Sequence, residues 1–205
     1  MKKLLAAAVM VLAMAGIAAP VTAGPAFLDK IYENGEPIKA KPGELRDMIE
    51  FRHARGFTQK EFVDLNGKKV KPAGFAGKLV IVDVWATWCE PCIRTLPAMV
   101  KLQKRYNTPE SDIRFVSIAF DKKAKTVQRF LKRQGFEGFN TLLDPKMELS
   151  QDLPTDVIPT FFVLDGKGAL VGFIRGYADW GADAIHPYLR ALADKYAKRD
   201  GDIVN

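Results

Sequence analysis

Residues 79–92 read LVIVDVWATWCEPC, and this stretch decides the fold. Its first seven residues are an apolar run interrupted only by Asp83, a pattern typical of a strand buried on both faces of a sheet. A helical pattern follows from about Glu90 to Tyr106, with Pro97 inside it. Cys89 and Cys92, the only cysteines in 205 residues, therefore lie at the start of a helix that follows a buried strand.

The flanking sequence predicts an α/β domain whose central mixed sheet is flanked by helices. Asn66-Gly67 favours a hairpin with a tight type I′ turn over residues 62–70. Upstream, Leu45, Met48 and Ile49 stand at helical spacing, so we expect a helix over 43–55. The other predicted elements are strands at 113–120 and 139–143, a hairpin at 160–164 and 169–175, and helices at 126–134 and 182–198.

The N-terminus has the layout of a secretory signal peptide. Lys2 and Lys3 precede an apolar segment, and small residues up to Ala23 predict cleavage after residue 23. An uncleaved inner-membrane anchor is the alternative, although the apolar segment is shorter than the roughly 20 residues that a span needs. We therefore expect a periplasmic protein, with residues 24–61 as an unassigned extension that contains a helix and 62–200 as the main domain.

The formal net charge is +7, but the sequence has no basic stripe interleaved with aromatic residues. The lysines and arginines at 122–133 are scattered and lie on or next to a predicted helix, which indicates a solvated surface with mild steering of acidic partners. Nucleic-acid binding is not predicted.

The cysteine pair has three possible uses. If the pair were a structural disulfide, closing so short a loop would add only about 2 kcal/mol to the stability of the fold. A metal site needs two more ligands, and the only histidines, His53 and His186, lie far apart, so we expect no metal. As a redox pair, Cys89 at the helix start has a lowered pKa, and Pro91 fits the first turn without losing a hydrogen bond. Cys89 then exchanges with a substrate disulfide, and the shielded Cys92 resolves the mixed disulfide.

Several residues around the pair resemble the thioredoxin superfamily, and most closely its exported TlpA/ResA kind. Trp85 and Trp88 stand four and one residues before Cys89, and Pro97 stands eight after it. Ile158-Pro159 resembles the cis-proline loop that faces the dithiol, although sequence leaves an ordinary trans proline open. The resemblance implies a thioredoxin-like fold with an N-terminal hairpin and a central helix–strand insertion. It also implies that Trp88, Ile158 and Pro159 bind substrate.

Asp83, six residues before Cys89, is the third catalytic candidate. In thioredoxin-type folds this position lies behind the second cysteine, where a buried acid with a raised pKa can take the proton of Cys92. A strand-end acid that reaches solvent is the alternative. Thioredoxin has a lysine at the position of Ser117, so Asp83 is expected to lack a cationic neighbour.

Glu90 and Pro91 separate the cysteines, and the charge of Glu90 opposes a Cys89 thiolate, which favours a reductant over a strong oxidant. We expect a thiol–disulfide oxidoreductase that needs no cofactor and reduces disulfides of periplasmic proteins, possible substrates being apocytochromes and copper-site proteins. Its electrons would come from a dithiol donor, expected in the membrane. The alternatives are a disulfide oxidase or isomerase and a Cu(I)-binding or redox-sensing module.

Overall fold

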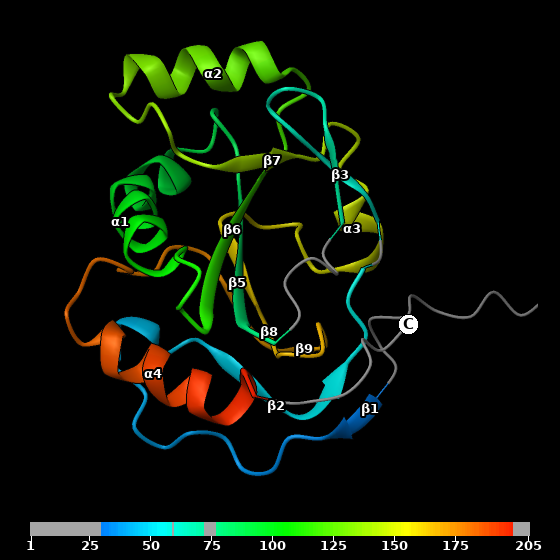
Figure 1. The fold of residues 1–205 in the computed structure, drawn as a ribbon, viewed down its shortest axis with the longest axis vertical. Coiled ribbons are helices and arrows are strands. Elements are labelled where there is room, and N and C mark those ends of the chain that lie inside the picture. Colours follow the sequence, from blue (N-terminus) through cyan, green and yellow to red (C-terminus); the bar gives the residue numbers. More distant parts are fainter. Residues whose placement is uncertain (1–29, 59, 72–76, 199–205) are drawn as a thin grey trace, which may run out of the picture.

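The computed structural model describes residues 30–58, 60–71 and 77–198 (Figure 1). The predicted signal segment therefore lies outside the described residues. No helix in the described part of the chain is long and apolar enough to cross a bilayer.

Within these residues one mixed sheet has the strand order β1-β2-β9-β8-β5-β6-β7-β3-β4. The strands are β1 (Lys30–Glu33), β2 (Ile49–Arg55), β3 (Phe62–Asp64), β4 (Lys69–Val70), β5 (Leu79–Trp85), β6 (Ile113–Ala119), β7 (Thr141–Leu143), β8 (Thr160–Leu164) and β9 (Leu170–Arg175). The helices are α1 (Glu90–Tyr106), α2 (Ala124–Arg133), α3 (Leu149–Asp152) and α4 (Ile185–Tyr196), with a 3-10 turn at Gly43–Leu45. This is the α/β architecture that the sequence predicts.

Strand β5 is the middle strand in the order of the sheet. All seven of its residues are buried, as expected for an apolar run between two neighbouring strands. It pairs in parallel with β6 and antiparallel with β8. The register sets Asp83 beside Ser117 of β6 and Phe161 of β8.

Helices α1 and α4 lie together on one side of the sheet (Figure 1). The hydroxyl of Tyr106 at the end of α1 lies 2.9 Å from Nδ1 of His186 in α4. Gln103 of α1 reaches Ser117 in β6, with 3.2 Å between Nε2 and Oγ. Since residues in register on neighbouring strands share a face, Asp83 and Ser117 both face α1.

The predicted helix over 43–55 is wrong. Leu45 and Met48 are buried as their spacing suggested, but only a short 3-10 turn forms there, and Ile49–Arg55 is strand β2. Strand β2 pairs with β9, where a Cβ on Gly172 would lie 2.6 Å from the carbonyl oxygen of Ile49. Pairing with an open strand edge has overridden the local helical pattern. The extension before residue 62 thus adds two strands to the same sheet.

The predicted hairpin at residues 62–70 forms as β3 and β4, but its turn differs from the expected type I′. The N–H of Gly67 donates to the carbonyl of Asp64 at 3.0 Å, and only Gly67 in this loop has a positive φ, +85°. The loop is therefore a three-residue turn that ends in a left-handed glycine. The Asp64 carboxylate accepts the N–H groups of Asn66 and Lys68 and holds the turn.

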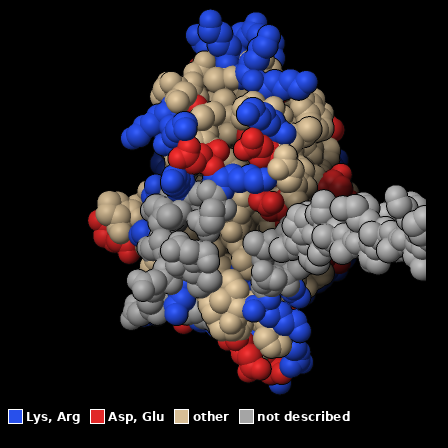
Figure 2. All heavy atoms as spheres, turned by 90° about the vertical axis from the view of Figure 1, so that its right-hand side faces the viewer, with Lys and Arg blue, Asp and Glu red and all other residues tan. Residues whose placement is uncertain are grey.

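Helix α2 packs beside this hairpin, since Gln128 donates to the carbonyl of Leu65 at 3.1 Å. Figure 2 shows lysines and arginines gathered at the end of the molecule where Figure 1 places α2. The basic residues of α2 are Lys125, Arg129, Lys132 and Arg133, and the helix carries no acidic residue.

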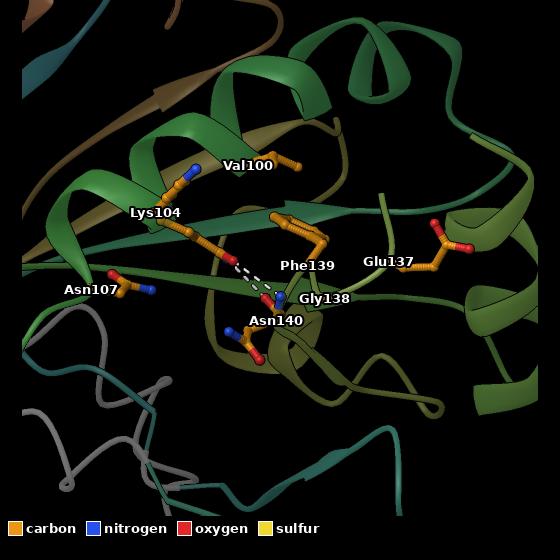
Figure 3. Close-up of a pocket in the computed structure, with 8 residues that line it drawn as sticks. Val100, Lys104, Asn107, Glu137, Gly138, Phe139 and Asn140 are labelled. Atoms are coloured by element: carbon orange, nitrogen blue, oxygen red, sulfur yellow. Dashed lines mark hydrogen bonds between the residues drawn. The ribbon is translucent and has the colours of Figure 1, made fainter. Parts of the chain in front are cut away.

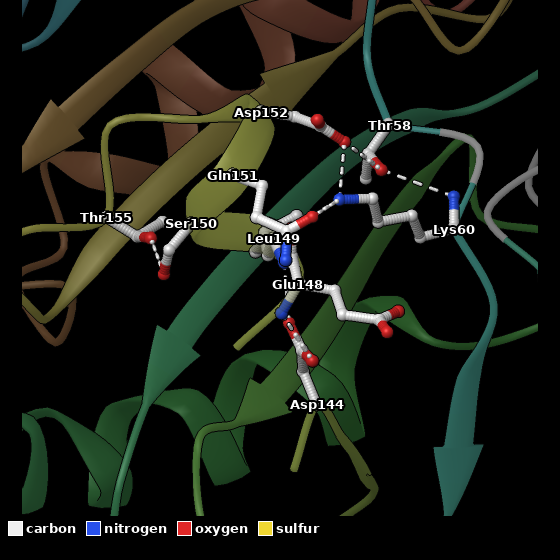
Figure 4. Close-up of polar contacts among 9 residues, drawn as sticks. All are labelled: Thr58, Lys60, Asp144, Glu148, Leu149, Ser150, Gln151, Asp152 and Thr155. Atoms are coloured by element: carbon white, nitrogen blue, oxygen red, sulfur yellow. Dashed lines mark hydrogen bonds and ion pairs between the residues drawn. The ribbon is translucent and has the colours of Figure 1, made fainter. Parts of the chain in front are cut away.

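Polar contacts tie the residues before β3 to α3 (Figure 4). Nζ of Lys60 donates to the Glu148 carbonyl at 2.7 Å and lies 3.3 Å from the Asp152 carboxylate, which also accepts the Thr58 hydroxyl at 2.9 Å. Asp144 caps the start of α3 by accepting the N–H of Leu149 at 2.7 Å. These contacts fix the segment that lies between β7 and the Ile158–Pro159 loop.

Candidate active site

The two cysteines meet at the first turn of α1. Cys89 is the N-cap residue, and its Sγ accepts the N–H of Cys92 at 3.2 Å. The two residues form a disulfide with 5.2 Å between their Cα atoms. Cys92 is fully buried, whereas Cys89 keeps 5% of its surface exposed. Both cysteines are therefore buried, but only Cys92 is completely shielded.

The Ile158–Pro159 loop lies against Cys89. The peptide bond between these residues is cis, so the trans alternative left open by the sequence is wrong. Sγ of Cys89 lies 3.6 Å from the carbonyl oxygen of Ile158. The hydroxyl of Thr160 donates to the Val157 carbonyl at 2.5 Å and fixes the loop from its other end.

A groove of about 540 Å³ runs past Cys89 between the start of α1 and the 147–158 segment. Of the predicted site residues, Trp88, Cys89, Glu90, Pro91 and Ile158 line it. Trp88 is 66% exposed beside Cys89. The apolar surface of this groove is accessible to a partner.

Sequence reasoning missed the other wall of the groove. Met147 and Val157 line it with about half of their surfaces exposed, and the other residues of this wall are Phe120, Ser150, Thr155 and Asp156. Met147 has a positive φ of 51°, an uncommon conformation outside glycine. Phe120 and the 147–158 segment meet α1 only in the folded chain, so no local pattern could have identified this wall.

Asp83 does not line the groove. It is only 1% exposed, so the alternative of an acid reaching solvent is wrong. Its Oδ2 accepts the hydroxyl of Ser117 at 3.1 Å, while Oδ1 is buried with no hydrogen-bond partner among the described residues. Burial raises the pKa of Asp83 to about 7, and the hydrogen bond from Ser117 opposes that rise. The carboxyl group thus titrates near neutrality on the side of the sheet that α1 covers.

The loop before Cys89 is held by a second buried acid, Asp121. Its carboxylate accepts the backbone N–H of Thr87 at 2.9 Å and the Thr87 hydroxyl at 2.6 Å. These bonds fix the turn from β5 into α1, because Thr87 lies midway between Trp85 and Cys89. The carboxyl end of β6 therefore positions the cysteine loop.

A cysteine pair at a helix start, a cis-proline loop against it and a buried acid in the central strand define a thioredoxin-fold thiol–disulfide protein. The model of the Redoxin family matches residues 54–185, and the chain belongs to that family. It is a thiol–disulfide oxidoreductase of the thioredoxin-like kind.

Named relatives agree with this assignment. The chain is 30% identical over 129 residues to thiol-disulfide oxidoreductase ResA of Bacillus thuringiensis subsp. konkukian, covering 63% of this chain and 72% of ResA. A Chlorobium tepidum structure assigned as thiol:disulfide interchange protein DsbE is 25% identical, with a TM-score of 0.56 over 67% of this chain and 96% of that one. A secreted thiol-disulfide isomerase of Corynebacterium glutamicum shares the fold at 16% identity, with a TM-score of 0.60 over 82% and 98%.

Proposed function

We propose that the protein reduces disulfide bonds of periplasmic proteins, with Cys89 as nucleophile, Cys92 as resolving cysteine and Asp83 as general base. The observation that carries this proposal is the unequal burial of the two sulfurs. Cys89 lies on the groove, 3.6 Å from the carbonyl oxygen of Ile158, whereas Cys92 is fully buried behind it. Only Cys89 can meet a substrate disulfide.

The first step is attack by the Cys89 thiolate on a substrate disulfide. An S–S bond forms between Cys89 and the substrate, the substrate S–S bond breaks, and one substrate thiolate leaves. The Cys92 N–H that contacts Cys89 Sγ at 3.2 Å, together with the helix dipole, favours the thiolate. The substrate backbone pairs beside the cis proline, at Ile158, and Trp88 packs on its side chains.

The second step is resolution by Cys92. Its S–H bond breaks, Asp83 accepts the proton, and the sulfur attacks Cys89 Sγ. The mixed disulfide breaks, the second substrate thiolate leaves, and the Cys89–Cys92 disulfide of the structure remains. Because the pKa of Asp83 is about 7, its carboxyl group can accept and later release this proton near neutral pH.

Two electrons and two protons must then return from another dithiol protein, which we place in the membrane. No organic cofactor is needed, since the sulfur pair holds both electrons. The periplasmic location rests on the signal-like residues 1–23, and the secreted neighbour from Corynebacterium glutamicum supports it. Glu90 beside Cys89 favours the reducing direction.

The test is to trap the mixed disulfide in the periplasm. Cys92→Ser should accumulate covalent complexes that dissolve with reductant, while the matched variant Cys89→Ser should accumulate none. The trapped partners would distinguish apocytochromes from copper-site proteins. Complexes formed equally through Cys92 would contradict the assigned roles. A measured reduction potential near that of a strong oxidant would make the protein a disulfide-forming oxidase, and defined Cu(I) binding with little turnover would make it a metal-binding module.

A further inference from the structure

The two oxygens of Asp83 have different surroundings. Oδ2 accepts the Ser117 hydroxyl at 3.1 Å, and Oδ1 is buried with no hydrogen-bond partner in the described part of the chain. No ion pair joins Asp83 to another described residue, and burial and Ser117 are the only influences resolved on its pKa. Within the described part of the chain, Ser117 is therefore the one side chain that holds this carboxyl group by a hydrogen bond.

Gln103 sets the direction of the Ser117 hydroxyl. Its side-chain amide makes two hydrogen bonds with the backbone of Asn140, since Nε2 donates to the carbonyl at 2.8 Å and Oε1 accepts the N–H at 3.1 Å (dashed in Figure 3). This pairing fixes which end of the amide is the donor. Nε2 also donates to Ser117 Oγ at 3.2 Å, so the Ser117 proton points to Asp83.

On the β8 side, the neighbours of Asp83 are aromatic rings. Phe161 of β8 lies beside it, and Trp180 packs on Phe161 with 4.8 Å between the ring centroids. From α4, burial and Glu50 raise the pKa of Tyr188, which keeps that phenol neutral in the physiological range.

Among the other titratable groups of α1 and α4, His186 of α4 lies at the C-terminal end of α1, against its last residue. His186 contacts Tyr106, and burial together with Arg105 lowers its pKa. Among the described residues, Ser117 is the only side chain that donates a hydrogen bond to an Asp83 oxygen, and Gln103 orients that donor.

We propose that Ser117 and Gln103 are positioning residues that hold Oδ2 of Asp83 and leave Oδ1 as the atom that accepts the Cys92 proton. This inference rests on the proposed role of Asp83 as the base. In the step, the S–H bond of Cys92 breaks and an O–H bond forms at Oδ1. The electron pair left on sulfur forms the bond to Cys89 Sγ as the substrate thiolate leaves.

The test follows resolution in the reduced protein mixed with dithiobis(nitrobenzoate). Attack by Cys89 releases a first thionitrobenzoate, and attack by Cys92 on the resulting mixed disulfide releases a second, which absorbance records. Ser117→Ala removes the only hydrogen-bond donor to Asp83 among the described residues, so the apparent pKa of the second phase should rise by about one unit. Gln103→Met should move it in the same direction by less, because the Ser117 hydroxyl remains but is no longer oriented.

Tyr32→Phe is the matched control, because it also removes a hydroxyl that donates to a buried carboxylate, Asp165, away from the cysteines. The pH dependence of the second-phase rate in this variant should coincide with that of the wild type. If Asp83→Asn flattens the profile but Ser117→Ala and Gln103→Met leave it in place, the inference is wrong and the base assignment stands. If Asp83→Asn also leaves the profile unchanged, the proposed base is wrong. Carboxyl-carbon NMR of Asp83 in the folded variants reports the same shift independently of turnover.

Discussion

Asp83 in strand β5 and Asp165 directly after strand β8 are both buried carboxylates, but their surroundings differ. Asp165 accepts the hydroxyl of Tyr32 and the N–H groups of Lys167 and Ala169, the latter two at 3.0 Å. Asp83 accepts one hydrogen bond, and its second oxygen has no partner among the described residues. A buried charge needs compensation, so the protein holds Asp165 with several donors and leaves Asp83 with one.

The two positions have different tasks. Asp165 follows β8 and organises the turn into β9, while Tyr32 ties strand β1 of the extension to the same turn. Asp83 lies in the strand that leads to the cysteines. The number of donors thus separates a carboxylate that stabilises the fold from one that is free to exchange a proton.

The largest expected effect concerns stability against pH. The folded protein keeps the Asp83 proton up to about pH 7, whereas the unfolded chain releases it near its ordinary pKa of 3.8. Stability from this group is therefore fully present below about pH 4, falls as pH rises to 7 and stays low above it. The shift corresponds to a loss on the order of 4 kcal/mol.

Urea unfolding of the oxidised protein at several pH values measures this loss. Asp83→Asn cannot lose a proton, so its stability relative to the wild type should improve from pH 4 to pH 8. If the free energies of unfolding of the two proteins changed with pH in parallel, ionisation of Asp83 would not destabilise the folded state.

The next effect is kinetic. Asp83→Asn removes the proton acceptor, and general-base contributions predict about a 100-fold slower resolution step. Attack by Cys89 on the substrate should keep its rate, because Asp83 does not line the groove. The two phases of thionitrobenzoate release separate these steps. A slowdown of both phases together would point to a general disturbance of the site.

Asp165→Asn tests whether the carboxylate that has several donors stabilises the fold. The amide cannot accept from all three donors, so an N–H or hydroxyl is left unsatisfied, at a cost of about 2 kcal/mol. Urea unfolding at pH 7 measures this loss. Activity per folded molecule should stay unchanged, and a selective loss of resolution would mean that Asp165 also serves the chemistry.

The sequence predicted Asp83 and the cysteine helix because the information is local. An apolar run gives β5, the spacing up to Tyr106 gives α1, and the cis proline follows from the family motif. Strand β2 was predicted as a helix, since its pairing with β9 depends on Gly172, far along the chain.

The groove wall and the single donor to Asp83 depend on tertiary contacts in the same way. Met147 faces Trp88 across the groove only in the folded chain. In the sequence, nothing distinguishes Gln103 from other polar residues of the helix. Its role is visible only because α1 packs beside Ser117 in the folded chain. Local patterns identify the reacting groups, while the partners that tune them come from distant segments.

Glu90 is a third carboxylate, exposed at the first turn of α1 beside Cys89. Its substitution is expected to have the smallest effect of the four. Glu90→Gln removes a negative charge that opposes the thiolate, so the reduced form gains stability and the reduction potential rises. Because solvent screens an exposed charge, we expect only about 10–20 mV, decreasing with added salt. Equilibration with glutathione measures the potential, and Glu110→Gln, an exposed acid before β6, is the control. A shift as large as that expected from a buried group would show that solvent does not screen the charge of Glu90 from the Cys89 thiolate.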